Sequence, residues 1–398
     1  GITVRIGREI ARGGEGIVYE IHGDSNHVAK IYFNEVSQEK QKKLFLMPGM
    51  ATKDLLSICA WPVEVLFAKS GGKLSGFVMP KIHGHEIHDL YSPASRKQIF
   101  PDADWPFLIR VARNLAAAID TIHMHGHVIG DINQKGILIV KPQGVVRLID
   151  CDSFQIQHNN SHFFCDVAVR DFTPPELQRR SLSGVLRTRN HDNFGLAVLC
   201  FQLLFLGRHP FVGLYNARRD IPLEEAIKEF LFVYSSAAAK KLSPPPNALP
   251  LLATSALVSN LFEKAFCKEA ASYNGRPSAI EWVKALDKLS LELRTCSQNK
   301  QHKYHSSLNK CPWCSLEINI GPIFIEINAK YYDTPSLNVD DLWQKINSVP
   351  TPGDASIPIF NFSNLVGTPL PSAVKFAKYK RYGLRAFSLC LSGILFFN

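Results

Sequence analysis

The sequence lacks the features that mark secreted and membrane-spanning proteins. Its nine cysteines are spread over 398 residues, and six of them stand singly, mostly among apolar residues, so no disulfide framework is expected. No signal peptide is recognisable at the start. We therefore expect a cytoplasmic protein with mostly free thiols.

Long apolar runs are also missing. The most apolar stretch, 384–398, is too short to span a bilayer. It follows a basic run from Lys375 to Arg381, so it could be part of a truncated membrane segment whose basic flank stays in the cytoplasm, allowing membrane association. It could equally be a packed terminal helix or strand.

Charge is present but not concentrated. Charged residues make up 20% of the chain and apolar residues 46%, a balance typical of soluble globular proteins. The net charge of +10 is spread along the sequence. Diffuse positive charge favours a solubility surface over nucleic-acid recognition, so no specific nucleic-acid partner is expected.

The order of secondary-structure patterns predicts an α+β protein. Residues 1–80 contain short runs of β-branched and aromatic residues separated by turns, with a helix at 35–45. After residue 105, apolar residues recur at helical spacing. The expected helices are 105–125, 193–206, 223–234, 256–266 and 279–291, with a strand pair at 137–140 and 145–149.

A glycine-rich turn and a lysine stand on neighbouring predicted strands. Gly13, Gly14 and Gly16 separate the first two strands, where backbone N–H groups can surround a phosphate. Lys30 lies within the apolar strand that follows. A lysine in such a strand is explained if it holds the α- and β-phosphates of a nucleotide.

Two aspartates follow in an order that suits phosphate transfer. Asp131 comes directly after a helix and a short turn, where its carboxylate can accept a hydroxyl proton. Asp150 lies at the end of a strand, where it can hold Mg²⁺ or Mn²⁺.

This order resembles the protein kinase family. The resemblance implies a two-lobed fold, with an N-lobe of about 1–80 and a C-lobe of about 81–291, and assigns Asp131 as the catalytic base and Asp150 as the metal-binding aspartate. It also implies a hinge with Met79 as gatekeeper, Pro80 offering a carbonyl and Ile82 an N–H to adenine. The remaining residues expected beside the nucleotide are Val18, Ala29 and Asn133.

Later motifs extend the resemblance. The segment 173–177 (TPPEL) resembles the end of a kinase activation segment, and Gly275-Arg276-Pro277 resembles the late arginine motif. An ion pair between Glu176 and Arg276 is therefore expected. Lys30 should pair with a helix carboxylate, for which Glu39 is preferred and Glu35 is the alternative.

Several positions depart from the kinase pattern. Gly130 replaces the arginine that usually precedes the catalytic aspartate, so control by loop phosphorylation is less expected. Gly136 replaces the asparagine that holds a second metal ion. Asp152 could supply that second carboxylate ligand, or it could only cap a turn.

A cysteine and histidine cluster follows the last predicted helix. Cys296, His302, Cys311 and Cys314 have the residue types and spacing of a structural zinc site, with His305 as the alternative to His302. A redox role for the Cys-x-x-Cys pair is less favoured. A zinc-ribbon-like module is thus predicted over 292–330, followed by a linker at 331–383.

The kinase motifs and the Cys-Pro-Trp-Cys ribbon together resemble a bacterial group of kinases encoded in three-gene modules with a PP2C-type phosphatase and a von Willebrand A protein. This resemblance implies Ser/Thr kinase activity on a protein substrate, with ATP, Mg²⁺ and Zn²⁺ as cofactors and those two proteins as partners. The alternative hypothesis is a nucleotide-binding pseudokinase that acts as a scaffold, because Gly136 has no metal-ligand atom.

Overall fold

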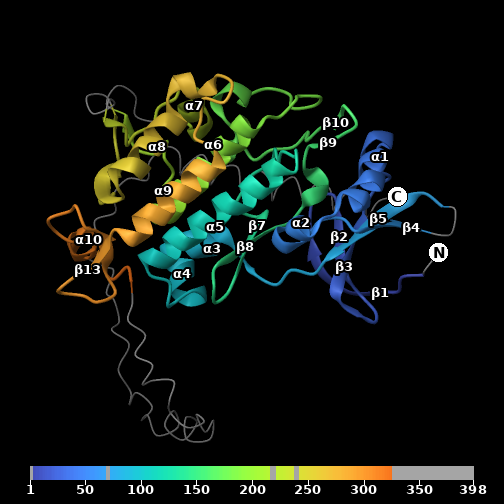
Figure 1. The fold of residues 1–398 in the computed structure, drawn as a ribbon, viewed down its shortest axis with the longest axis horizontal. Helices are drawn as coiled ribbons and strands as arrows, with labels where there is room; N and C mark the ends of the chain where they lie inside the picture. Colours follow the sequence, from blue (N-terminus) through green and yellow to red (C-terminus); the bar gives the residue numbers. More distant parts are fainter. Residues whose placement is uncertain (1–2, 69–71, 216–220, 237–241, 325–398) are drawn as a thin grey trace, which may run out of the picture. The chain divides into compact units, whose positions relative to one another are not determined.

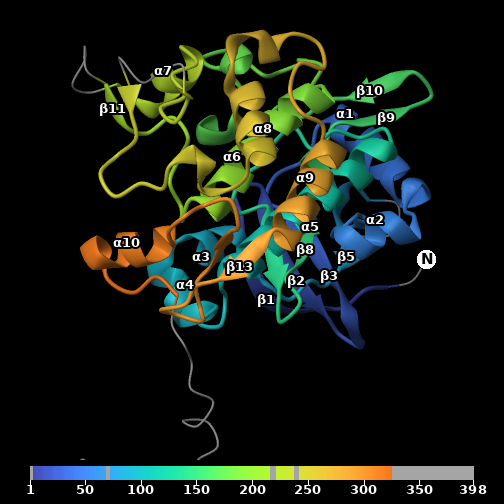
Figure 2. The same cartoon turned by 60° about the vertical axis from the view of Figure 1, so that its left-hand side comes forward.

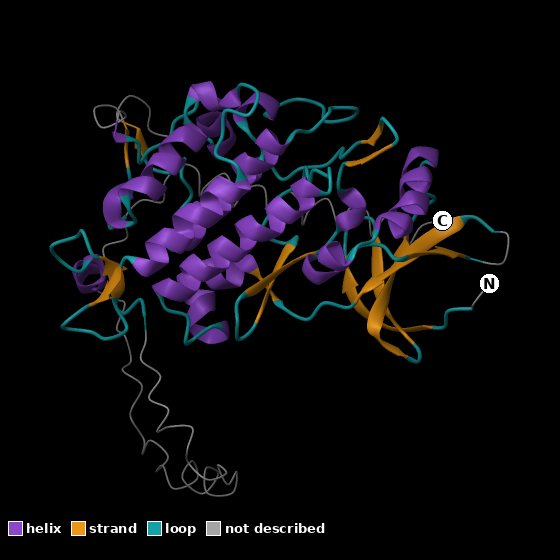
Figure 3. Cartoon of the chain, viewed as in Figure 1, coloured by secondary structure: helices purple, strands orange, loops and turns teal. Residues whose placement is uncertain are grey.

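The computed structural model describes residues 3–68, 72–215, 221–236 and 242–324, all within one compact unit. The expected linker at 331–383 and tail at 384–398 lie outside the described residues. The described fold mixes helix and sheet, as predicted, with the longest strands before residue 81 and the longest helices after residue 104 (Figure 3).

The first sheet has five antiparallel strands in the order β1-β2-β3-β5-β4. Its strands are β1 (Ile6–Arg12), β2 (Gly16–Ile21), β3 (Asp24–Tyr32), β4 (Glu64–Phe67) and β5 (Leu74–Pro80). Two helices, α1 (Gln38–Leu46) and α2 (Lys53–Ile58), connect β3 to β4 (Figure 1). The Ser37 side chain accepts a hydrogen bond from Lys40 N–H at 3.2 Å and so caps α1.

The helical part is built around α5 (Trp105–Met124). Asp104 caps this helix through Phe107 N–H, and one face of α5 is buried. The helix α9 (Ala279–Leu291) runs beside α5 (Figures 1 and 2), and α6 (Arg189–Leu204) also packs on α5. The remaining helices of this part are α3 (Ile87–Tyr91), α4 (Pro93–Ile99), α7 (Leu223–Lys228) and α8 (Ala256–Phe266).

Short strands lie in the connections between these helices. A three-stranded sheet contains β6 (His85–Glu86), β7 (Ile137–Val140) and β8 (Val145–Leu148). Two smaller pairs are β9 (Ile156–His158) with β10 (Ser161–Phe163), and β11 (Leu214–Tyr215) with β12 (Leu242–Ser243). Because β7 and β8 are antiparallel, the residues before β7 (131–136) and after β8 (149–153) lie at the same end of this sheet, where Ile149 N–H donates to the Gly136 carbonyl at 2.9 Å.

A small module follows α9. It contains the hairpin of β13 (Leu293–Thr295) and β14 (Lys303–His305), then α10 (Pro312–Ile320). Trp313 of α10 is fully buried, and its ring centroid lies 5.2 Å from that of Trp105 in α5. The module is therefore packed into the same core as the long helices.

One predicted helix is shorter than expected. The helix predicted over 223–234 ends at Lys228, because Phe230 has a φ of 57°, in the left-handed region that ends helical geometry. Within the described ranges, no helix has both the length and the apolar character needed to cross a bilayer.

Candidate nucleotide and metal sites

The glycine-rich turn joins β1 to β2. Gly13 N–H donates to the Gly16 carbonyl at 2.9 Å and closes the turn. Gly16 is required by close backbone packing, because a Cβ there would lie 2.3 Å from the Ile31 carbonyl oxygen. At Gly14 a Cβ would meet no atom within 4 Å. Packing within the chain therefore does not explain Gly14, whereas a phosphate approaching the backbone would.

Asp131 and Asp150 line one small cavity, although 19 residues separate them. The cavity has a volume of about 20 Å³, and Asn133 and Gly136 also line it. Asp150 has a φ of 57°, and its side chain is 62% exposed. Such a carboxylate is open to a metal ion, and strained backbone of this kind occurs often at functional sites.

The carboxylate of Asp131 is held by the segment that follows β10. Its Oδ1 accepts a hydrogen bond from Val169 N–H at 3.0 Å. Burial raises the pKa of Asp131, while its contacts with Asn133 and Val169 oppose that shift. The Asn133 side chain donates to the Asp131 carbonyl at 3.0 Å and accepts from Gly136 N–H at 3.1 Å. Asn133 thus stabilises the turn that carries Asp131.

A buried aspartate supports the backbone before Asp131. Asp192, in α6, accepts hydrogen bonds from Ile129 N–H at 2.7 Å and Gly130 N–H at 2.8 Å. Its Oδ2 also lies 3.0 Å from His123 Nε2. These contacts fix the direction in which the chain enters Asp131. Asp192 lies 63 and 62 positions after these two donors, so local sequence patterns do not indicate the contact.

Lys30 pairs with carboxylates of the segment after β8. Its Nζ lies 2.8 Å from Asp152 Oδ1, 3.1 Å from Asp152 Oδ2 and 3.4 Å from Asp150 Oδ1. The prediction that Lys30 pairs with Glu39 or Glu35 is therefore wrong. Glu39 is exposed in the first turn of α1, and Glu35 pairs with Lys73 at 2.7 Å.

The inner side of α1 carries lysines instead of a carboxylate. Lys40 Nζ contacts Glu15 of the glycine-rich turn at 2.5 Å and Asp152 Oδ2 at 3.4 Å. Lys43 is 4% exposed, and burial lowers its pKa to about 8. Ion pairs therefore run from Glu15 through Lys40 and Asp152 to Lys30.

Arg187 holds the segment between β10 and α6 close to Asp131. This buried guanidinium donates to the Gly130 carbonyl from Nη1 and to the Val167 carbonyl from Nη2, both at 3.2 Å. Gly130 has a φ of +75°, and a Cβ there would lie 2.7 Å from Cys165 Cβ. Arg187 thus ties the backbone at Gly130 to the backbone at Val167.

The predicted hinge follows β5. Met79 is buried and pairs with Val28 across the sheet. Lys81 N–H donates to the Asn26 carbonyl at 2.7 Å, so it is already engaged. Among the described residues, no hydrogen-bond acceptor faces Ile82 N–H. The Ile82 N–H is therefore available to a ligand, and its role in adenine binding stays a prediction.

The expected pair of Glu176 and Arg276 is present. The two side chains form a double contact, with Nη1–Oε1 at 2.7 Å and Nη2–Oε2 at 2.8 Å. The Arg276 side chain is fully buried, and Nη1 also donates to the Asn190 carbonyl at 3.1 Å. This bidentate pair joins residues that are 100 positions apart.

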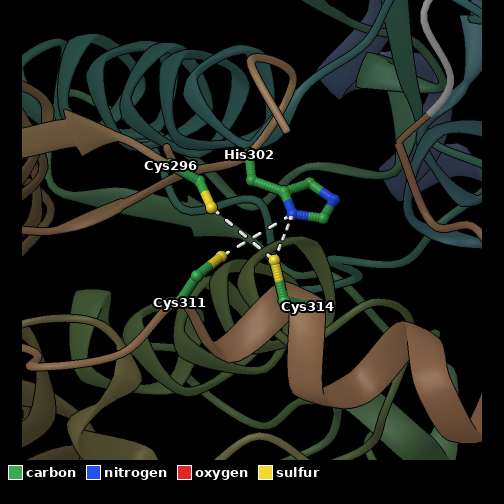
Figure 4. Close-up of side chains that lie close together, drawn as sticks. All are labelled: Cys296, His302, Cys311 and Cys314. Carbon is green, nitrogen blue, oxygen red and sulfur yellow. Dashed lines mark hydrogen bonds between the residues drawn. The ribbon is translucent and has the colours of Figure 1, made fainter. Parts of the chain in front are cut away.

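Cys296, His302, Cys311 and Cys314 converge at the turns of the small module (Figure 4). Cys296 Sγ lies 3.6 Å from Cys314 Sγ, and His302 Nδ1 lies 3.4 Å from Cys314 Sγ and 3.6 Å from Cys311 Sγ. Tetrahedral zinc would separate two sulfurs by about 3.8 Å and a sulfur and a nitrogen by about 3.6 Å. The four residues therefore have the spacing of a zinc site.

The alternative histidine lies elsewhere. His305 Nε2 contacts Glu292 at 3.1 Å, and its Nδ1 contacts Ser307 at 2.6 Å. His302 Nε2, by contrast, lies 3.0 Å from Glu317 Oε1, which leaves Nδ1 turned toward the cysteines. A carboxylate on the far nitrogen of a ligating histidine is a common orienting contact in metal sites.

Three supporting residues have weak or absent sequence signals: Asp192, Arg187 and Lys40. Each contacts residues more than 20 positions away, so local patterns do not reveal their partners. A partial signal exists for Lys40, because Lys40 and Lys43 share one helix face, and a buried basic face needs an acidic partner elsewhere.

No family model matches the chain. It is 40% identical to the curated protein "Protein kinase YegI" of Escherichia coli (strain K12) over 403 residues, covering 99% of this chain and 62% of that protein. The protein of the same name from Escherichia coli O157:H7 gives the same identity and coverage. A more distant similarity, 22% over 214 residues, is to "Serine/threonine-protein kinase/endoribonuclease IRE1b" of Arabidopsis thaliana, covering 49% of this chain and 23% of that protein.

The chain is thus similar to two curated proteins named as protein kinases over nearly all of its own length. The relationship to the bacterial relatives extends over nearly all of this sequence, including the cysteine module. The chain spans 62% of the length of those relatives.

Proposed function

We propose that the chain is an ATP-dependent Ser/Thr protein kinase, in which a two-lobed kinase domain at 1–291 precedes a zinc module. The observation that carries this proposal is the convergence of Lys30, Asp131 and Asp150 from three distant segments. Homology to a named protein kinase supports it.

Each of the three residues has a role that its surroundings fit. Lys30 binds the α- and β-phosphates, and the turn at Gly13, Gly14 and Gly16 encloses them. Asp131, held by Val169 N–H, orients the substrate hydroxyl and accepts its proton.

Asp150 is the residue that fits a divalent metal. Its carboxylate is largely exposed and borders the cavity that Asp131 shares. When bound, Mg²⁺ or Mn²⁺ neutralises phosphate charge during transfer. Asp152, the predicted second ligand, fits that role less well because Lys30 and Tyr32 already contact its oxygens.

A pseudokinase is the second candidate, favoured by Gly136. A Cβ at this position would meet only ordinary contacts, the nearest being Asn133 Nδ2 at 3.8 Å. Steric crowding therefore does not explain the missing ligand side chain, and a site that binds nucleotide without transfer would explain it.

The deciding experiment is incubation of the full chain with ATP labelled at the γ-phosphate, with and without a generic protein substrate. We expect label on protein hydroxyls in the presence of Mg²⁺ or Mn²⁺ and none when both ions are left out. Absence of label with either metal, together with ATP-dependent thermal stabilisation, would support the pseudokinase.

We also propose that Cys296, His302, Cys311 and Cys314 bind structural Zn²⁺. All four ligand atoms lie within 4.8 Å of one another, and protein ligands would fill every position of a tetrahedral site. A redox function fits less well, because four converging side chains suit one metal ion.

Purified chain should contain close to one zinc per molecule by elemental analysis. Replacing Cys311 with Ser should remove the metal and destabilise the chain by several kcal/mol, because metal binding is coupled to folding of the module. Cys267, outside the module, provides the matched control, since Cys267→Ser should leave zinc content and melting temperature nearly unchanged. Less than half an equivalent of zinc in the unmodified chain would contradict the proposal.

The partners follow from the resemblance alone. We propose a protein substrate, a PP2C-type phosphatase and a von Willebrand A protein. A cytoplasmic location and membrane association through 384–398 stay predictions from the sequence.

A further inference from the structure

We propose that Asp152 is the positioning residue for Lys30, and that a carboxylate from the metal-site segment replaces the helix carboxylate that kinases use for this purpose. The proposal rests on the proposed nucleotide-binding function of Lys30. It assigns Asp152 a role distinct from metal binding.

The contacts of Asp152 are those of a buried ion-pair partner. Its side chain is 1% exposed, and Lys30 Nζ approaches both of its oxygens, at 2.8 and 3.1 Å. Tyr32 Oη donates to Oδ2 at 2.8 Å. Both carboxylate oxygens of Asp152 are therefore already contacted by donors from within the chain.

The helix α1 cannot supply the missing carboxylate. Its only acidic residue, Glu39, is exposed in the first turn. The residues that approach Asp152 from this helix are basic: Lys40 lies 3.4 Å from Oδ2, and the charge of Asp152 raises the pKa of buried Lys43 against the effect of burial. In the usual kinase pair, the carboxylate lies on the helix. Here the carboxylate, Asp152, lies on the segment that also carries Asp150, and the helix carries lysines instead.

The pairing of Lys30 with Asp152 changes the way in which α1 could affect Lys30. Lys30 belongs to β3, and Asp152 belongs to the turn Cys151–Ser153 after β8, so neither partner of the pair lies on α1. A kinase whose lysine pairs with a helix loses that pair when the helix moves. Here α1 instead links the glycine-rich turn to Asp152 through Lys40 and Glu15.

A double-mutant cycle tests the pairing. Wild type, Lys30→Met, Asp152→Asn and the double variant are compared for affinity toward a fluorescent ATP analogue and for kcat and KM of phosphate transfer. We expect Asp152→Asn to lower kcat/KM at least about tenfold in the wild-type background and less than about threefold when Lys30 is already Met, because Asp152 acts through Lys30. Effects that multiply in the double variant would overturn the proposal.

Metal dependence separates this role from metal binding. If Asp152 positions Lys30, the Mg²⁺ concentration for half-maximal nucleotide binding should be unchanged in Asp152→Asn. A rise of about fivefold or more would identify Asp152 as a metal ligand and overturn the proposal. The matched control is Glu39→Gln, which removes the exposed helix carboxylate and should alter both kcat and KM less than about twofold.

A second variant and a binding measurement cover the cases in which Asp152→Asn does not fold or the wild type is inactive. If Asp152→Asn fails to fold by thermal melting, Tyr32→Phe removes one hydrogen bond to Asp152 without changing charge. It should lower kcat/KM about threefold, and only while Lys30 is present. If Tyr32→Phe lowered kcat/KM equally in the Lys30→Met background, the proposed pairing would be overturned. If wild type transfers no phosphate, the proposed kinase function fails, but the affinity cycle still decides the role of Asp152.

Discussion

Asp131→Asn is expected to reduce the rate of phosphate transfer about a thousandfold, because a positioned general base typically contributes 10²–10⁴-fold. Asparagine keeps the shape of the side chain and can still accept the hydrogen bond from Val169 N–H. The loss should therefore appear in kcat, with little change in KM for ATP. Initial rates with labelled ATP measure it.

The matched control is Asp54→Asn, since Asp54 is an exposed carboxylate on α2, outside the site. Its rate should stay within about twofold of wild type. If Asp131→Asn retained a tenth of the wild-type rate or more, a role as base would be excluded.

The pH dependence of the phosphate-transfer rate provides a second test of Asp131 as the base. Burial raises the pKa of Asp131, so protonation removes the base at a higher pH than for an exposed aspartate. We expect the rate to fall as pH decreases through this raised pKa. In Asp131→Asn, this part of the profile should disappear.

Arg276→Ala should destabilise the fold by about 3–5 kcal/mol, the usual result of removing one partner of a buried ion pair. The remaining Glu176 carboxylate would lose both hydrogen bonds to the guanidinium, and the Asn190 carbonyl would lose one. Urea denaturation measures the change in the free energy of unfolding.

An exposed pair on the same helical scaffold provides the control. Arg113 Nε lies 3.0 Å from Asp287 Oδ1, between α5 and α9, and both side chains are substantially exposed. Arg113→Ala should cost about 0–1 kcal/mol. The Glu176→Ala/Arg276→Ala double variant should lose less than the sum of its single variants, and additive losses would contradict direct pairing.

The accuracy of sequence-based prediction depended on how local each signal was. The helices at 105–124 and 279–291 follow from apolar spacing and caps, so their prediction needed no distant contact. The Glu176–Arg276 pair was found because both residues lie in motifs of fixed order. The cysteine module was also predictable, since zinc-ligand spacing is short in sequence.

The partner of Lys30 was not predictable in the same way. Glu39 lies on the expected helix, but that helix presents Lys40 and Lys43 toward Asp152 and leaves Glu39 exposed. Asp152 follows Lys30 by 122 positions and belongs to a turn whose path depends on tertiary packing. The sequence indicated that Asp152 was unusual, but a choice between metal ligand and ion-pair partner required the geometry.

The burial of Trp313 bears on where the foldable unit ends. Its ring packs against Trp105 at 5.2 Å and against Phe324 at 5.0 Å, and Trp105 belongs to the central helix α5. A shortened chain that ended after α9 would keep the kinase motifs but would expose the indole of Trp105 to water. The motif boundary near residue 291 and the boundary of the hydrophobic core are therefore different places in this chain, and the core extends at least to Phe324.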